Sequence, residues 1–264
     1  MKTTLYDTIG ANYNATRKAD PHISEKIFQL LNPGPAGTYL DIGCGTGNYL
    51  HALTNMGLSF YGIDPSETML QAARLKNPQT TFINGKAENI ALPDNFFSGA
   101  IAVLTIHHWE SLRQGLKEIH RVLKPGVKIV FFSFTPEQMK GYWLYHYFPA
   151  MIESAMKIIP TLKEMESLLI ASGFTAIDSE PYFVQDGLQD HFMYSNKHRP
   201  EMYLSAEVRN NASAFSALAA KDEVEHGLVS LKMDIASGKI GGIMEQYKNN
   251  LGDYLFITAI KSGY

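Results

Sequence analysis

A glycine-rich segment carries the clearest chemical signal in the sequence. Residues 41–47 read DIGCGTG and lie between a short apolar run and an amphipathic one, which predicts a loop that leaves a strand and opens a helix. Glycines let such a loop turn tightly and approach a ligand closely, because no Cβ intervenes. The spacing is G-x-G-x-G rather than the G-x-G-x-x-G of dinucleotide-binding loops, and Asp41 stands two residues before the first glycine. Since a carboxylate fits poorly against a pyrophosphate, we expect a cationic or zwitterionic ligand.

A second carboxylate follows the next apolar run. Asp64 stands 21 residues after Gly43, at the expected end of the following strand. A carboxylate at that strand end can accept hydrogen bonds from both hydroxyls of a ribose. The alternative interpretation is that Asp64 only caps the helix that begins near Ser66. A polar loop at 85–89 follows the third apolar run, and its backbone groups can read the edge of an adenine.

Two adjacent histidines follow the fourth apolar run. His107 and His108 precede Trp109 at the expected carboxyl edge of the sheet, where ligands bind in open α/β folds. Histidine titrates near neutral pH, so His107 is the candidate general base. The competing interpretation is that one histidine orients the following helix while the other packs on Trp109. The sequence contains no H-E-x-x-H motif and no close His/Asp cluster, so we expect no metal site.

A framework of alternating strands and helices must position these residues. Apolar runs predict strands at 38–42, 58–63, 80–84, 99–104 and 127–134, and amphipathic stretches predict helices at 48–56, 66–76 and 110–123. An earlier helix is expected to begin at Pro21, with Asp20 as its N-cap. Later strands are expected at 174–184 and 253–261, and a helix that follows Thr161 is expected to end at Gly173. This alternation predicts parallel βαβ units and hence a doubly wound α/β sheet.

Composition narrows the class of protein. The chain has 264 residues and a net charge of −3 with mixed signs, which gives no electrostatic footprint for nucleic acid. No apolar run approaches the ~18–20 residues of a membrane helix, and the opening MKTTLYDTIG lacks the apolar stretch of a signal peptide. The single cysteine, Cys44, excludes an intramolecular disulfide. We therefore expect a cytoplasmic protein, a monomer or homodimer, that binds neither nucleic acid nor membrane.

The motifs, taken in order, resemble one family. The segments YLDIGCGTGNYL, YGIDPSETML, NGKAENIALPDNFF, AVLTIHHWESLRQGLKEIHRVLKPG and LLIASGF are similar to the class I S-adenosylmethionine-dependent methyltransferases, in the type 11 or UbiE-like small-molecule group. The resemblance covers roughly residues 5–184 and the last strand. It implies a Rossmann-like sheet that is mostly parallel with an antiparallel last strand, and S-adenosylmethionine as the cofactor.

Carried over by position, the resemblance implies a set of cofactor contacts. Asp41 and the glycines would line the methionine end, which Thr105 would also reach, and Asp64 would hold the ribose. Tyr13 and Arg17 resemble N-terminal residues that close over the cofactor. Lys86 stands where many relatives carry an aspartate. The implied cofactor-binding residues are Tyr13, Arg17, Asp41, Gly43, Cys44, Gly45, Asp64, Pro65, Met69, Ala87, Glu88 and Thr105.

Two stretches of the chain lie outside the strands and helices that build the predicted sheet. Residues 141–149 hold five aromatic side chains, and residues 186–250 form an insertion too long for a plain connection of about 2–5 residues. We expect one domain over residues 1–264. Its cofactor-binding core would comprise about 20–136, 161–184 and 253–262, and its helical cap or lid would comprise 1–19, 137–160 and about 186–250. The candidate acceptor pocket consists of His108, Tyr142, Trp143, Tyr145, Tyr147, Tyr203 and Arg209, although the aromatic residues at 141–149 could equally belong to a buried helix.

The predicted function is methyl transfer by in-line displacement to an oxygen or nitrogen of a small-molecule acceptor. One alternative is a carbon methyltransferase that acts on an activated ring or quinol and uses His107 as base. An alternative of another class is a non-catalytic S-adenosylmethionine-binding sensor or assembly protein.

Overall fold

The chain folds into two compact units. The computed structural model describes residues 17–210 and 213–263. Unit 1 contains the described residues of Met1–Ser133, Lys163–Glu180 and the described residues of Phe256–Tyr264, while unit 2 contains Phe134–Leu162 and the described residues of Pro181–Leu255. Each unit is therefore assembled from separated segments of the chain.

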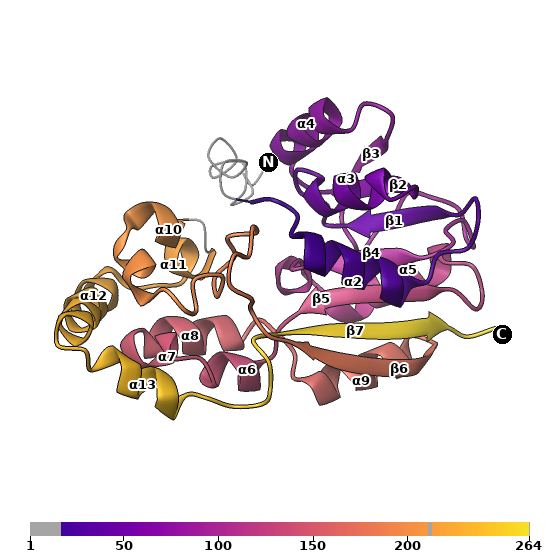
Figure 1. The fold of residues 1–264 in the computed structure, drawn as a ribbon. Coiled ribbons are helices and arrows are strands. Elements are labelled where there is room, and N and C mark those ends of the chain that lie inside the picture. The colour runs from indigo at the N-terminus through magenta and orange to yellow at the C-terminus, as the bar shows by residue number, and fades with distance from the viewer. Residues whose placement is uncertain (1–16, 211–212, 264) are drawn as a thin grey trace. The chain divides into compact units, whose positions relative to one another are not determined.

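A seven-stranded sheet forms the centre of unit 1, in the order β3-β2-β1-β4-β5-β7-β6 (Figure 1). Its strands are β1 Thr38–Ile42, β2 Ser59–Asp64, β3 Thr81–Asn84, β4 Ala100–Val103, β5 Lys128–Ser133, β6 Phe174–Tyr182 and β7 Tyr254–Lys261. Strands β1 to β5 pair in parallel. Strand β7 is antiparallel to β6, since Ser262 N–H donates to the Gly173 carbonyl near one end and Asp253 N–H donates to the Tyr182 carbonyl at the other. The predicted Rossmann-like fold is confirmed.

The strand order reverses between β1 and β4. The chain runs outward through β2 and β3 and returns to β4 on the other side of β1, with Leu40 beside Ala100 and Asp41 beside Ile101. Because β1 and β4 are neighbouring parallel strands, the loops that follow them start next to each other. At such a reversal the two loops continue in opposite directions, and this leaves a crevice in which ligands bind.

Helices pack against this sheet within unit 1. They are α2 Pro21–Leu31, α3 Asn48–Asn55, α4 Glu67–Lys76, η1 Ile106–His108, α5 Leu112–Val122 and α9 Leu162–Ala171. The predicted N-cap of α2 is confirmed, because Asp20 accepts hydrogen bonds from the N–H groups of His22 and Ile23. Helix α5 begins two residues later than predicted, since the Ser111 hydroxyl accepts from Gln114 N–H and sets the start of the helix.

Unit 2 is mainly helical. Its helices are α6 Pro136–Lys140, α7 Leu144–Tyr147, α8 Pro149–Met156, η2 Pro200–Leu204, α10 Ala206–Asn210, α11 Ser213–Ala217, α12 Lys221–Ala236 and α13 Ile240–Gln246. Residues 183–199 form turns, in keeping with their Asp, Asn and Gly content. Glu223 of α12 accepts hydrogen bonds from Ala150 and Met151 N–H at the start of α8. The Glu223 carboxylate therefore caps the start of α8 and links α12 to α8.

Candidate active site

The glycine loop lies between the carboxyl end of β1 and the start of α3. Gly43, Gly45 and Gly47 all have positive φ, at 68°, 53° and 70°. The N–H groups of Gly43 and Cys44 donate to the Ile63 carbonyl, over 2.8 and 3.1 Å. The loop is therefore fastened to the end of β2, in a backbone conformation that glycine adopts at little cost.

Gly43 and Thr105 meet where the loops after β1 and β4 start. A Cβ on Gly43 would lie 1.9 Å from Thr105 Oγ1, so no side chain fits there. The residue before Thr105, Leu104, has a φ of 51°, which is strained for a bulky side chain. Nothing in the sequence indicates this strain, which lies just after the carboxyl end of β4.

The Asp64 carboxylate is hydrogen-bonded to the glycine loop. Its Oδ2 accepts from Gly45 N–H over 2.9 Å and its Oδ1 accepts from Ser66 N–H over 2.9 Å. The α4 cap itself belongs to Ser66, whose hydroxyl accepts from Met69 N–H.

Asp41 is a buried carboxyl group in the same unit. Its side chain is almost inaccessible, with 3% of the residue exposed. Burial, together with the charge of Asp64, raises the pKa of Asp41 to about 8. The group therefore carries a proton at neutral pH, and a nearby cation would favour its ionised form.

The residues implied at the adenine side occupy α4 and the loop after β3. Met69 and Ala87 are buried and Pro65 is exposed. Glu88 accepts from Ser111 N–H over 3.0 Å, which ties this loop to the start of α5. Lys86 pairs with Glu110 over 2.6 Å on the surface, which raises the pKa of Lys86.

The two histidines form the short helix η1. Their ring centroids lie 3.9 Å apart. Burial, His108 and the charge of Arg17 hold the pKa of His107 well below its usual range, and burial with Arg17 lowers the pKa of His108 to about 4. The Arg17 carbonyl accepts from Asn48 Nδ2 over 3.0 Å at the start of α3. Tyr13, the other N-terminal residue implied by the resemblance, lies outside the described residues.

Cys44 keeps its thiol proton. Burial and the charges of Asp41 and Asp64 raise the pKa of Cys44 well above its usual range. A Cβ on Gly62 of β2 would lie 2.8 Å from its sulfur, so the side chain packs against that strand. Its backbone, rather than its thiol, is placed to serve the loop.

Four buried hydroxyls in unit 1, on Thr46, Thr54, Ser133 and Ser172, were not predicted, and two of them lie at carboxyl ends of strands or in the loops that follow. Thr46 Oγ1, in the glycine loop, and Ser133 Oγ, at the carboxyl end of β5, have no hydrogen-bond partner within the described part of the chain. Ser133 was detectable in principle, because it is a polar residue within an otherwise apolar run that continues to Phe134. Buried polar groups of this kind deserve a functional explanation, since most find partners.

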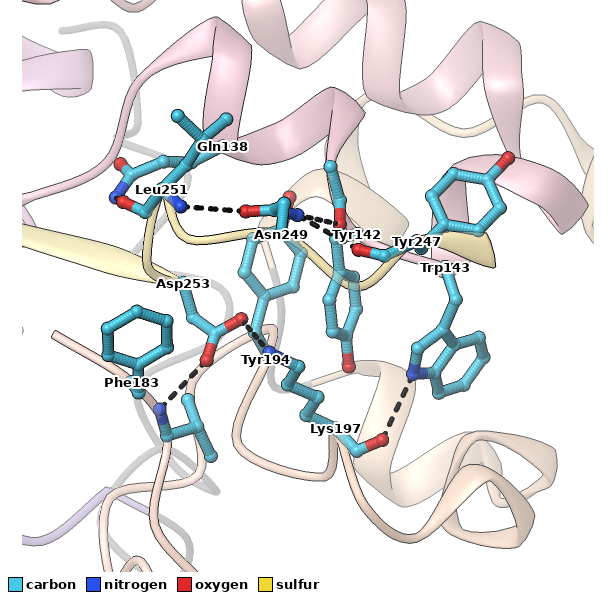
Figure 2. Close-up of polar contacts among 12 residues, drawn as sticks. Gln138, Tyr142, Trp143, Phe183, Tyr194, Lys197, Tyr247, Asn249, Leu251 and Asp253 are labelled. Carbon is cyan, nitrogen blue, oxygen red and sulfur yellow. Dashed lines mark hydrogen bonds and ion pairs between the residues drawn. The ribbon is translucent and has the colours of Figure 1, made fainter. Parts of the chain in front are cut away.

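The aromatic residues proposed for the acceptor lie within unit 2, apart from His108. Tyr142, Trp143, Tyr147 and Tyr203 are buried, and Tyr142 Oη lies 3.0 Å from Tyr203 Oη. Trp143 Nε1 donates to the Lys197 carbonyl over 3.0 Å (Figure 2).

The other two proposed residues of this unit are held by different contacts. Tyr145 donates to Glu153 over 3.0 Å at the surface, and Arg209 donates to the Tyr203 carbonyl over 2.7 Å. The structure thus brings Tyr142, Trp143 and Tyr203 together, while Tyr145 takes a separate, exposed contact.

Across residues 17–210 and 213–263, no three His, Cys, Asp or Glu side chains are grouped so as to hold a metal ion. In the same part of the chain, no helix has the length and apolar character needed to cross a bilayer.

Comparison with known proteins places the chain in a family. A family model described as a methyltransferase domain matches residues 40–131, which include the glycine loop, Asp64 and both histidines. A crystal structure from Anabaena variabilis, named as a putative methyltransferase from an antibiotic biosynthesis pathway, is 37% identical with a TM-score of 0.82, and the match covers 92% of this chain and 98% of that chain. The chain belongs to the S-adenosylmethionine-dependent methyltransferase family.

Curated relatives of this methyltransferase-family chain match over shorter stretches. An uncharacterized methyltransferase from Mycobacterium bovis is 31% identical over 51% of this chain and 55% of its own length. A demethylmenaquinone methyltransferase from Bacillus licheniformis is 27% identical over 60% of this chain and 79% of its own length. The chain thus spans about half the length of the first of these relatives.

Proposed function

We propose that this chain transfers a methyl group from S-adenosylmethionine to an oxygen or nitrogen atom of a small-molecule acceptor. The observation that carries the proposal is the joint placement of the glycine loop, Asp41, Asp64 and Thr105 at the carboxyl ends of β1, β2 and β4. Membership of the family supports the reaction class.

The residues present fit the proposed cofactor. When bound, S-adenosylmethionine supplies an electrophilic methyl group on a positively charged sulfur. Gly45 leaves open space at the loop, since no described atom lies within 4 Å of the position that its Cβ would take. Asp64 ends β2, where a carboxylate can accept hydrogen bonds from ribose hydroxyls. The buried carboxyl of Asp41 would ionise beside a cation, because opposite charge favours the charged form.

The task left to the protein is mainly alignment and exclusion of water. Holding two reactants in line can supply about 7–11 kcal/mol of the barrier reduction. A general base adds to this only when its pKa suits the proton it removes. Because burial and neighbouring charges lower the pKa of His107, it is neutral at pH 7 but drives proton transfer weakly. This supports an amine nitrogen or an acidic hydroxyl as the acceptor.

The second candidate is methylation of a carbon atom on an activated ring or quinol. The Bacillus licheniformis relative is named a demethylmenaquinone methyltransferase, which is the observation that favours this candidate. A carbon acceptor must lose a proton to a base, and His107 is the candidate for that role. His107→Ala would then abolish turnover while the affinity for S-adenosylhomocysteine stays unchanged. The exposed His22 of α2 gives the matched control, His22→Ala. A near-normal rate in His107→Ala would exclude the base role.

Cofactor binding is tested by thermal shift with S-adenosylhomocysteine and, in parallel, NAD. A ligand at about 100 times its dissociation constant stabilises a protein by roughly 2.7 kcal/mol. We expect stabilisation by S-adenosylhomocysteine alone, reduced in Asp64→Ala and retained in Asp178→Ala, whose side chain is exposed on β6. Stabilisation by NAD alone would contradict the assignment. Product formed from methyl-labelled cofactor separates an enzyme from a non-catalytic binding protein.

A further inference from the structure

The Asp41 carboxyl of unit 1 is buried without a partner. It lies near the carboxyl end of β1 and the residue is 3% exposed. Within residues 17–210 and 213–263 no hydrogen bond or ion pair reaches this carboxyl, and its surroundings act on it through burial and the charge of Asp64. Asp20, which is equally buried, accepts from two N–H groups at the start of α2. Buried polar groups usually have partners of that kind, so Asp41 requires an explanation.

The neighbouring carboxylate is held in the opposite way. Asp41 pairs in register with Gly62 of β2, two residues before Asp64. Asp64 accepts from the N–H groups of Gly45 and Ser66, over 2.9 Å each, and hydrogen bonds of this kind favour an ionised carboxylate. Two carboxyl groups at adjacent strand ends resist joint ionisation, because like charges repel most strongly where water is excluded. Asp41, which has no donors, is therefore the one that holds a proton.

The other titratable and charged groups around the glycine loop keep their charge near neutral pH. Strand β4, the second neighbour of β1, carries no titratable side chain over Ala100–Val103. Cys44 keeps its proton, because burial and the two carboxyl groups hold its pKa well above the usual range. The charge of Arg74 on α4 reaches Cys44, and a guanidinium stays protonated.

The histidines nearby do not change charge near neutral pH either. After β4, the pKa of His107 lies well below its usual range and that of His108 is about 4, so both rings are neutral, and the charge of Arg17 contributes to this. On α3, His51 Nδ1 lies 2.8 Å from Asn77 Oδ1. A proton that leaves this site near neutral pH therefore has one expected source, the Asp41 carboxyl.

The loop that follows Asp41 leaves space for a cationic ligand. Gly43, Cys44 and Gly45 are partly exposed, and no described atom lies within 4 Å of the position that a Cβ on Gly45 would take. S-adenosylmethionine carries an ammonium group and a positively charged sulfur. A cation close to a carboxyl lowers its pKa by roughly 1–3, and the starting value for Asp41 is about 8. Asp41 would then be ionised in the complex and protonated in the unliganded chain.

We infer that Asp41 is a specificity-determining residue that favours a cationic cofactor, and that it releases its proton to the solvent when S-adenosylmethionine binds. This inference rests on the proposed function, which places the cofactor at this loop. The O–H bond of the carboxyl breaks, both of its electrons stay on the oxygen, and the proton passes to water or buffer. Affinity for the cofactor should therefore rise with pH, because a high proton concentration opposes the release.

Calorimetry of S-adenosylmethionine binding, with no acceptor present, counts the released protons. The binding enthalpy of the full chain is measured at pH 7.0 in buffers with different ionisation enthalpies, and its slope against the ionisation enthalpy gives the number of protons. We expect roughly half to one proton per bound cofactor in the wild-type chain, and none in Asp41→Asn. Asp178→Asn, which changes an exposed carboxyl on β6, should release as many protons as the wild-type chain.

The same titrations at two pH values provide a second measurement. Between pH 5.5 and 7.0 the dissociation constant of the wild-type chain should fall roughly fivefold, and that of Asp41→Asn should stay constant. The α-amino group of the cofactor remains mostly charged over this range, since its ordinary pKa is about 7.7–8.0. The change in affinity thus reports on the protein.

Two results would overturn the inference: a wild-type chain that binds the cofactor without releasing a proton, or a release that persists in Asp41→Asn. The first needs no variant, so the test stands even if Asp41→Asn does not fold. Binding without proton release would leave the proposed function intact. A chain that shows neither binding heat nor thermal stabilisation with S-adenosylmethionine would refute the proposed function and this inference together.

Discussion

The glycine loop of unit 1 and a group of four buried tyrosines in unit 2 are both rich in buried polar groups, but they are built in opposite ways. We call these four residues, Tyr142, Tyr194, Tyr203 and Tyr254, the tyrosine cluster. In the glycine loop, Asp64 accepts from Gly45 and Ser66, which belong to the same pair of successive βα turns. In the tyrosine cluster, Tyr142 and Tyr203 meet across 61 positions of sequence. The first site is made of local motifs, and the second exists only because distant segments fold together.

The difference shows which physical property restricts substitutions in each site. Backbone conformation dominates the loop, since three glycines at positive φ and a 1.9 Å approach leave no room for a side chain on Gly43. In the cluster the hydrogen bonds between hydroxyls matter most, because the removal of one hydroxyl changes which groups donate and accept. Substitutions in the loop should therefore act on ligand affinity first, and substitutions in the cluster on stability.

The largest effect is expected from Gly43→Ala. The new Cβ would collide with Thr105 Oγ1 and occupy a backbone conformation that costs L-residues about 1–2 kcal/mol. We expect the affinity for S-adenosylhomocysteine, measured by calorimetry, to fall more than a hundredfold. Gly57→Ala is the control, because Gly57 has a φ of 95° with no atom near its Cβ position. Equal affinity losses in the two variants would show that strain alone, and not the contact with Thr105, is responsible.

The next effect concerns pH and Asp41. Its pKa of about 8 lies above the ordinary value of 3.8, so between these values the folded chain holds a proton that the unfolded chain has released. Stability therefore falls as pH rises through this window, by up to about 1.4 kcal/mol per pH unit for one proton. In Asp41→Asn this contribution should vanish. Urea unfolding at pH 5, 6.5 and 8 measures it, and parallel pH dependences in both proteins would contradict the assignment.

A smaller effect is expected in unit 2 from Gly227→Ala. A Cβ at this position of α12 would lie 2.5 Å from the Tyr147 carbonyl oxygen and 2.5 Å from the Phe148 ring. Overpacking of this kind typically costs about 1–3 kcal/mol. Denaturant unfolding should show the loss, while the affinity for S-adenosylhomocysteine stays unchanged. A comparable drop in that affinity would break the distinction between the two sites.

The smallest effect is expected from Tyr142→Phe. The change removes the donor to Tyr203, while Tyr203 keeps its own bond to the Met193 carbonyl. The free energy of unfolding should fall by about 1 kcal/mol, which is the usual contribution of one hydrogen bond. Tyr194→Phe, which removes a hydroxyl without a partner among the described residues, should be neutral or stabilising in the same unfolding assay. The reverse order of stabilities would show that the proton assignment in the cluster is wrong.

Local patterns explain why so much of unit 1 was predictable. Strand β1 was expected and found at 38–42, and each of β2 to β5 lies within one residue of its predicted limits or is slightly shorter. Asp20 before Pro21 acts over three residues, which a sequence displays directly, whereas the Ser111 cap was missed and the predicted start of α5 was two residues early. The left-handed φ of Leu104 was not predictable, because nothing in a leucine favours it.

The sequence by itself determined the alternation of strands and helices, the glycine loop and the order of its carboxylates, because each depends on residues that are neighbours in the chain. Only the tertiary structure decided that Asp41 is buried near a second carboxylate, that Arg17 lowers the pKa values of the two histidines, and that Tyr194 has an unused donor. These properties depend on what surrounds a group in space. The electrostatic environment of a side chain and the pairing of its protons are set by residues that packing brings together, whatever their separation in sequence.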